Sequence, residues 1–136
     1  MVGKRSKTVQ LKTAKGRTAS SQRWLRRQLN DPYVQEAQRL GYRSRSAFKL
    51  LQLDEKFKFL YQGQRVVDLG AAPGGWCQVA ANRVLTEKTG NIVGLDLLPM
   101  DPIPGVNLLQ TDFMSQEGLS ELMKILTDKV DLVISD

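Results

Sequence analysis

The residues best suited to chemistry lie in one stretch, VVDLGAAPGGW, residues 66–76. Asp68 ends an apolar segment, glycines follow, and Trp76 opens the next segment. The glycines are Gly70, Gly74 and Gly75. Glycines at a strand-to-helix turn let the backbone approach a ligand and expose N–H groups near a helix N-terminus. Ligands of open α/β sheets bind where strands end, so this turn predicts a binding site. The alternative is a purely structural turn.

The turn sequence, G-A-A-P-G-G, discriminates between ligands. It does not match the nicotinamide fingerprint G-x-G-x-x-G, and no Gly-Lys-Ser/Thr of a phosphate-binding loop is present. Asp68 would repel a phosphate but suits an ammonium group. A ligand that carries both an amine and a carboxylate, such as the methionine end of S-adenosylmethionine, fits better than a dinucleotide. A nucleotide-dependent oxidoreductase domain is the competing class, and it predicts NAD binding.

Three further acids follow predicted strands. Asp96 ends the second strand, where an acid can accept both hydroxyls of an adenosine ribose. Asp112 follows the third strand and can take the exocyclic amine of adenine, and Asp136 follows the fourth. Each aspartate alone reads as a turn or cap residue. Together with Asp68 they predict one acidic edge beside the glycine-rich turn.

The composition excludes several kinds of chemistry. There is no histidine, so Ser–His, Cys–His and His-ligated metal sites are ruled out. Cys77 is the single cysteine, which rules out an intrachain disulfide and a Cys-pair zinc site. We read Cys77 as a small apolar helix residue. We expect no metal, and no apolar run is long enough to cross a membrane.

Charge is distributed unevenly along the chain. Residues 1–50 carry 13 Lys and Arg against two acids, whereas residues 51–136 carry 7 against 12. This polarity predicts a basic front that meets a polyanion such as RNA, the alternative being a solvated tail. Residues 1–19 are predicted to be a disordered basic arm. A mitochondrial presequence is the other reading, because the first 30 residues contain no acid.

Residues 20–62 are predicted to form a helical RNA-binding segment. Ser20 or Ser21 is expected to cap the first helix. The second has Asp31 at its N-cap, Pro32 at its first position and Gly41 past its end. The third starts near Ser44 or Ser46 and runs toward Tyr61, with an apolar stripe of Leu50, Leu53, Phe57 and Leu60. Trp24 and Phe48 are expected in the core, although Trp24 or Tyr42 could stack on an unpaired base. The expected phosphate contacts are Arg23, Arg26, Arg27, Arg43 and Arg45.

From residue 63 to 136 strands alternate with helices, which predicts an α/β fold with a parallel sheet of about four strands. The predicted strands are 65–69, 91–95, 106–109 and 130–134. One predicted helix covers residues 76–87 and is closed by Gly90; its inward residues are Trp76, Val79, Ala80 and Val84. The other covers residues 116–127 and is capped by Ser115; its inward residues are Leu119, Leu122, Met123 and Leu126. Residues 97–105 contain three prolines and are expected to form no helix.

The motifs resemble those of one family. DLGAAPGGW, DLLPMDPI (residues 96–103), QTDF (residues 110–113) and the final Ser-Asp, together with residues 20–50, are similar to the FtsJ/RrmJ-type ribosomal RNA ribose 2′-O-methyltransferases. The resemblance implies a Rossmann-like class I S-adenosylmethionine-dependent methyltransferase fold preceded by N-terminal helices. It also implies that residues 63–136 are the first part of a seven-stranded domain whose C-terminal strands are absent from this chain.

By resemblance, Gly74, Gly75 and Trp76 line the methionine part of the cofactor, and Asp96 and Asp112 hold its adenosine. Lys49 and Asp136 match two members of the family's catalytic Lys–Asp–Lys–Glu group, whose remaining lysine and glutamate belong to later segments. We therefore expect residues 1–136 alone to be inactive on RNA. We also expect them to be poorly soluble, because without later strands the fourth strand is an unprotected sheet edge. The alternative for Lys49 is a phosphate contact.

The resemblance implies a cytoplasmic, monomeric enzyme that uses S-adenosylmethionine to methylate a uridine ribose in 23S RNA of the large ribosomal subunit. Transfer RNA or a messenger cap is the alternative substrate within this class. Outside it, the chain would bind S-adenosylmethionine and RNA without catalysis. Mitochondrial localisation is the alternative if the first residues form a presequence.

Overall fold

The computed structural model describes residues 18–136, so all but the last two residues of the predicted basic arm lie outside the described residues. The elements are α1 (Ala19–Asn30), α2 (Pro32–Leu40), α3 (Ser46–Phe57), β1 (Arg65–Leu69), α4 (Gly75–Val84), β2 (Asn91–Asp96), β3 (Val106–Gln110), α5 (Gln116–Ile125) and β4 (Leu132–Ser135).

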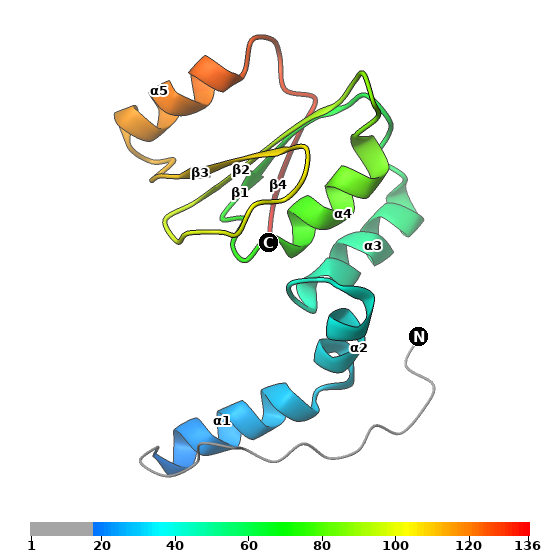
Figure 1. Ribbon diagram of the computed structural model, residues 1–136, viewed down its shortest axis with the longest axis vertical. Helices are drawn as coiled ribbons and strands as arrows, with labels where there is room; N and C mark the ends of the chain where they lie inside the picture. Colours follow the sequence, from blue (N-terminus) through cyan, green and yellow to red (C-terminus); the bar gives the residue numbers. More distant parts are fainter. Residues whose placement is uncertain (1–17) are drawn as a thin grey trace.

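The four strands form one parallel sheet in the order β3-β2-β1-β4. α3 and α4 lie on one side of the sheet and α5 on the other, while α2 and α1 extend away from it (Figure 1). The chain moves outward from β1 to β3 and then returns, through α5, to place β4 on the other side of β1. The strand order therefore reverses between β1 and β4, and in such sheets the carboxyl ends of the strands at the reversal form the ligand crevice. The predicted fold class is confirmed.

The core lies on both faces of the central strands. Val66 and Ile92 pack with α3 and α4, whereas Val67, Val93 and Leu95 pack with α5. Because both faces are covered, the interior positions of β1 and β2 are all buried, with no alternation between buried and exposed residues.

Capping determines where the first helices begin and end. Asp31 accepts hydrogen bonds from the N–H groups of Tyr33 and Val34, and Gly41 ends α2 at φ +82°, as predicted. The predicted cap of α1 is wrong. Thr18 Oγ1 accepts the hydrogen bond from Ser21 N, so α1 starts one residue before Ser20.

Several predicted core residues are exposed. Trp24 is 54% exposed and Phe57 is 61% exposed, while Phe48 is half-buried against Tyr33 and Tyr42. On α5, Leu119 and Met123 are exposed, and the residues that pack on the sheet are Leu122, Ile125 and Leu126. The prediction for α5 is thus confirmed for Leu122 and Leu126 and wrong for Leu119 and Met123, because apolar spacing defines a helix face without showing which edge of that face meets the sheet.

Most helices are shorter than predicted. α3 ends at Phe57, because the Asp54 carboxylate accepts hydrogen bonds from Phe59 N and Leu60 N and turns the chain. α4 ends at Val84 and not near Glu87, since Val84 O accepts a hydrogen bond from Gly63 N. α5 ends at Ile125, and β4 starts at Leu132, two residues later than predicted.

A buried polar tie joins α3 to α4. Asp54 is 3% exposed, and its second oxygen accepts a hydrogen bond from Arg83 Nη1 at 2.6 Å. The Trp76 indole N–H donates to Ser46 O at 2.8 Å across the same interface. Each buried polar group thus has a partner, which keeps the two helices in one register.

We expect Asp54→Ala to lower the free energy of unfolding by about 3 kcal/mol, because the variant leaves two backbone N–H groups and the Arg83 guanidinium without their acceptor. Chemical denaturation measures this. Glu55→Ala, on the exposed side of α3, is the matched control and should leave stability unchanged. Equal stability of both variants would contradict the role of Asp54.

Candidate functional site

Two of the four predicted acids meet where the strand order reverses. Asp68 at the end of β1 and Asp136 just after β4 line one hollow of about 140 Å³. Its other lining residues come from the glycine-rich turn and the start of α3: Ser44, Ser46, Gly70, Ala71, Ala72, Pro73, Gly75 and Trp76. The hollow combines carboxylates with the backbone of a glycine-rich turn, so it can take a cation beside an anion.

Asp96 and Asp112 follow the next two strands along the same edge. Asp96 accepts hydrogen bonds from Ala72 N and Leu98 N, both at 2.9 Å, so it supports the glycine-rich turn from the side of β2. Asp112 is exposed beyond β3, and its carboxylate accepts a hydrogen bond from Met114 N. These two acids lie beside the hollow and do not line it.

Two glycines of the turn, Gly74 and Gly75, have neighbours that leave no room for a Cβ. Gly74 has φ +116°, and a Cβ there would lie 2.9 Å from Ile103 Cδ1. A Cβ on Gly75 would lie 2.5 Å from Ser44 Oγ. The missing side chains therefore let the residues before α3 and the 97–105 crossover close on the turn.

Asp68 is the buried carboxylate of the site. It is 1% exposed, and Cys77 Sγ donates a hydrogen bond to its Oδ2 at 3.2 Å. Burial, with smaller contributions from the charges of Asp136 and Asp96, raises the pKa of Asp68 to about 6, and the Cys77 bond opposes that rise. Burial and the neighbouring Asp68 raise the pKa of the Cys77 thiol, which stays protonated as a donor. Cys77 is thus more than the apolar residue predicted from the sequence.

Lys49 and Asp136 form an ion pair, with 2.8 Å between Lys49 Nζ and Asp136 Oδ1. They line a second hollow, of about 410 Å³, whose other lining residues are Tyr33, Arg45, Ser46, Phe48 and Gln52. Ser46 and Asp136 belong to both hollows, so the two adjoin. A group held in the larger hollow would lie next to one held against Asp68.

The predicted basic contacts divide into two sets. Arg23, Arg26 and Arg27 are exposed on α1, where they can reach a polyanion. Arg45 pairs with Asp31 and lies over the Tyr33 ring, 5.6 Å from its centroid. Arg43 instead points its guanidinium at backbone carbonyls.

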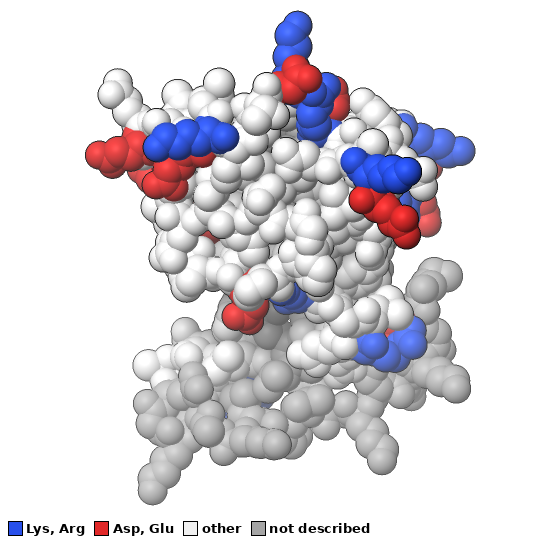
Figure 2. Space-filling model, turned by 45° about the horizontal axis from the view of Figure 1, so that its top comes forward, with Lys and Arg blue, Asp and Glu red and all other residues white. Residues whose placement is uncertain are grey.

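The face shown in Figure 2 carries charged side chains mainly at its margins, with acidic groups close to basic ones around a broad uncharged centre. On that face the described residues form no continuous basic patch.

Four residues that line the hollows were not predicted as site residues: Tyr33, Ser44, Ser46 and Gln52. Ser44 and Ser46 were predicted only as possible starts of the third helix. For Ser46 a signal was available, because it precedes Lys49 by three residues and so shares its side of α3. The helix period likewise places Gln52 three residues after Lys49. Nothing in the local sequence distinguishes Tyr33 or Ser44.

Within residues 18–136 no helix is both long and apolar enough to cross a membrane. Over the same residues, no cluster of three or more His, Cys, Asp or Glu side chains is arranged to hold a metal ion.

Comparison with known proteins identifies the family of the chain. The model of the FtsJ-like methyltransferase family matches residues 42–136. Proteins named ribosomal RNA large subunit methyltransferase E from Parvibaculum lavamentivorans and Paramagnetospirillum magneticum are 52% and 56% identical to the chain, each over 98% of it. The chain spans 56% of the length of each of these relatives.

A solved structure from Plasmodium falciparum, of a protein named as a ribosomal RNA methyltransferase, superimposes with a TM-score of 0.62 at 39% identity. The match covers 70% of this chain and 56% of that one. The resemblance inferred from the motifs is confirmed, and the chain belongs to the FtsJ-like methyltransferase family.

Proposed function

We propose that the chain forms the S-adenosylmethionine-binding part of an enzyme that methylates a ribose 2′-hydroxyl of a uridine in 23S ribosomal RNA. The observation that carries the proposal is the Lys49–Asp136 pair at the junction of the two hollows. The names of the relatives support ribosomal RNA as the substrate. An enzyme with this substrate would work in the cytoplasm, where bacterial ribosomes are made.

The residues of the smaller hollow fit the cofactor. Asp68 is a carboxylate that can hold the ammonium group of the methionine end, while N–H groups near the start of α4 can face its carboxylate. Asp96 and Asp112 stand further along the edge, on the side toward β3, where the adenosine would extend. When bound, S-adenosylmethionine supplies an electrophilic methyl group.

The larger hollow would hold the target nucleoside. Lys49 can then donate a hydrogen bond to the ribose oxygen and stabilise the negative charge that develops as the hydroxyl proton passes to a base. By resemblance to the family, that base is the second lysine of the catalytic group, which belongs to a later segment. Asp136 holds the ammonium group of Lys49 in place through the 2.8 Å contact. The common wall of the two hollows keeps acceptor and methyl donor in adjacent positions, as in-line transfer requires.

Recognition of RNA would fall to α1 and the start of α3. Arg23, Arg26 and Arg27 are free to approach phosphates, and Trp24 beside them is exposed enough to stack on an unpaired base. Arg45 borders the larger hollow and would contact the target strand there.

We expect Lys49→Ala to lower kcat by on the order of a hundredfold or more, with the affinity for S-adenosylmethionine unchanged, because Lys49 lines only the hollow assigned to the acceptor. The assay is methyl transfer to 23S RNA by the natural protein with whatever sequence flanks residues 1–136. The product must resist alkali, since a 2′-O-methyl group blocks strand cleavage.

Lys56→Ala is the matched control, because Lys56 is exposed near the end of the same helix. Full kcat in Lys49→Ala, or a base-methylated product, would rule out this assignment.

We expect the affinity for S-adenosylmethionine to fall as pH drops through about 6, the pKa of Asp68, because the protonated acid no longer attracts an ammonium group. Calorimetric titration at pH 7.5 and pH 5 measures this. Asp68→Asn should bind weakly at both values, and Glu87→Gln, which is exposed and far from the hollow, should behave as the parent. Equal affinity of the parent at both values would argue against this role of Asp68.

The raised pKa of Asp68 also has a consequence for the stability of the fold. Its pKa is higher in the folded protein than the ordinary 3.8, so the folded state binds the proton more tightly and the ionised form destabilises the fold. The destabilisation is complete above about pH 6, where Asp68 is ionised in both the folded and the unfolded state. It disappears below about pH 4, where Asp68 is protonated in both. Asp68→Asn should therefore raise the free energy of unfolding by roughly 2 to 3 kcal/mol at pH 7.5 and not at pH 4. Denaturant titrations at both values would detect it.

For the RNA contacts, we expect the double variant Arg26→Ala, Arg27→Ala to reduce the slope of log affinity against log salt by about two, roughly one per phosphate contact. Filter binding to 23S RNA across a salt series gives the slope. Lys124→Ala on α5, on the other side of the sheet, is the control for the loss of charge. An unchanged slope in the double variant would mean that RNA binds a surface other than α1.

A further inference from the structure

Arg43 lies in the turn between α2 and α3, and its guanidinium faces three backbone carbonyls. Arg43 Nη1 donates to Pro73 O at 3.2 Å and to Asp101 O at 2.5 Å, and Nη2 donates to Pro102 O at 2.7 Å. One side chain thus joins three segments far apart in sequence: the helical segment, the glycine-rich turn and the 97–105 crossover.

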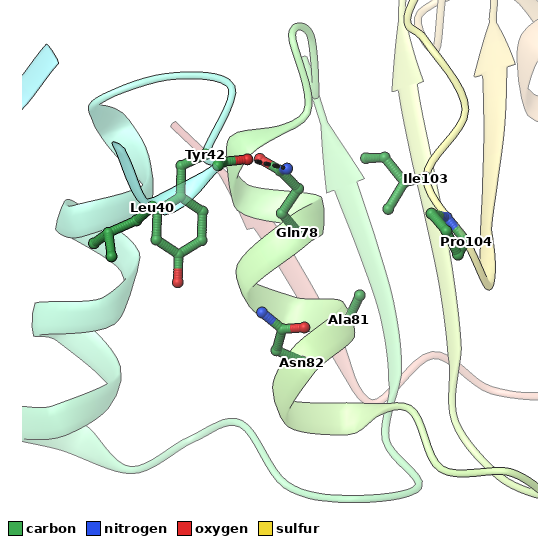
Figure 3. Close-up of a pocket in the computed structure, with 8 residues that line it drawn as sticks. Leu40, Tyr42, Gln78, Ala81, Asn82, Ile103 and Pro104 are labelled. Atoms are coloured by element: carbon green, nitrogen blue, oxygen red, sulfur yellow. Dashed lines mark hydrogen bonds between the residues drawn. The ribbon is translucent and has the colours of Figure 1, made fainter. Parts of the chain in front are cut away.

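The backbone of this turn is itself fixed to α4. The side-chain oxygen of Gln78 accepts a hydrogen bond from Arg43 N at 2.8 Å, and its amide N–H donates to Gly41 O at 3.0 Å. Figure 3 shows Gln78 reaching from α4 toward the chain beside Tyr42, with Ile103 on the opposite side. These hydrogen bonds fix the backbone at Arg43, so the side chain extends from a defined position.

The absence of a side chain at Gly74 leaves room for the Arg43 side chain. A Cβ on Gly74 would lie 3.1 Å from Arg43 Nη1 and 3.3 Å from its Cδ. Ile103, next to the bound carbonyl of Pro102, is 8% exposed and packs against the same glycine. The glycine-rich turn is thus shaped to receive Arg43 and the crossover together.

The crossover needs such a partner. Its prolines lack backbone N–H donors, so it cannot hold itself together by helical hydrogen bonds. Its carbonyl oxygens are nevertheless strong acceptors, and a guanidinium offers several donors in a rigid plane to satisfy them. The carbonyl oxygens around Arg43 carry partial negative charge, so they attract the guanidinium and repel a phosphate group.

We propose that Arg43 is a positioning residue for the cofactor pocket and not a phosphate contact: it clamps the proline-rich crossover onto the glycine-rich turn. The inference rests on the proposed function. With the clamp released, Pro73 and the crossover beside Asp96 lose their common anchor, and the pocket must be ordered when the cofactor binds. Part of the binding free energy is then spent on that ordering.

Arg43→Lys separates the two roles, because lysine keeps the charge that phosphate requires but carries its donors at a single point. We expect the Kd and KM for S-adenosylmethionine to rise on the order of tenfold in the natural protein. We also expect kcat at saturating cofactor, and the salt slope of RNA binding, to stay unchanged. Calorimetry and steady-state kinetics measure these quantities.

Arg39→Lys is the matched control, since Arg39 is an exposed α2 residue that forms an ion pair with Glu36. Ile103→Ala loosens the crossover without touching a charge and should show the same cofactor-specific loss, so it decides the matter if Arg43→Lys does not fold. If both variants bind the cofactor as tightly as Arg39→Lys does, the proposal is overturned. A parent protein that fails to bind S-adenosylmethionine at all would refute the proposed function instead.

Discussion

Parallel strand pairing is the constraint on which the rest of this structure depends. β1 pairs in parallel with β2 on one side and with β4 on the other, so the carboxyl ends of all these strands come to one edge. Because β4 joins β1 only after the chain has crossed to the other face, the edge opens between Asp68 and Asp136. Local sequence only has to supply acids and glycines at strand ends, and the topology gathers them.

Acids gathered in this way repel one another and lose contact with water. Two features reduce the unfavourable energy of the buried Asp68 carboxylate. Cys77 donates a hydrogen bond to it, and its pKa is raised so that the group is charged only above about pH 6. Gly94 makes the thiol contact possible, since a Cβ there would lie 2.8 Å from Cys77 Sγ. A site that holds unfavourable charge in the absence of a cation is prepared to bind one.

The helices before the sheet belong to the site as fully as the sheet does. α3 carries Lys49 to Asp136, and its position depends on the Asp54–Arg83 tie and on the Trp76 bond to Ser46. The turn before α3 carries Arg43, which binds the crossover. The basic N-terminal segment therefore both presents arginines outward on α1 and builds the walls of the two hollows.

Signals that act over a few residues were sufficient for much of this molecule. The cap at Asp31, the stop at Gly41, the glycine-rich turn after Asp68 and the lack of a helix in residues 97–105 follow from backbone chemistry alone. The alternation of strands and helices predicted the parallel sheet, and the motifs predicted the family. The exposure of Trp24 and Phe57 could not be predicted, because burial depends on which element packs opposite.

Contacts between distant segments were decided only by the tertiary structure. Arg43 is one of the five arginines that the sequence predicted as phosphate contacts, and only the folded chain places the carbonyls of residues 73, 101 and 102 around it. The Cys77 bond to Asp68 likewise arises from a strand and a helix packed together. The sequence by itself determined which groups stand at the ends of the strands; packing decided their partners, since hydrogen bonds over such separations exist only once the layers have assembled.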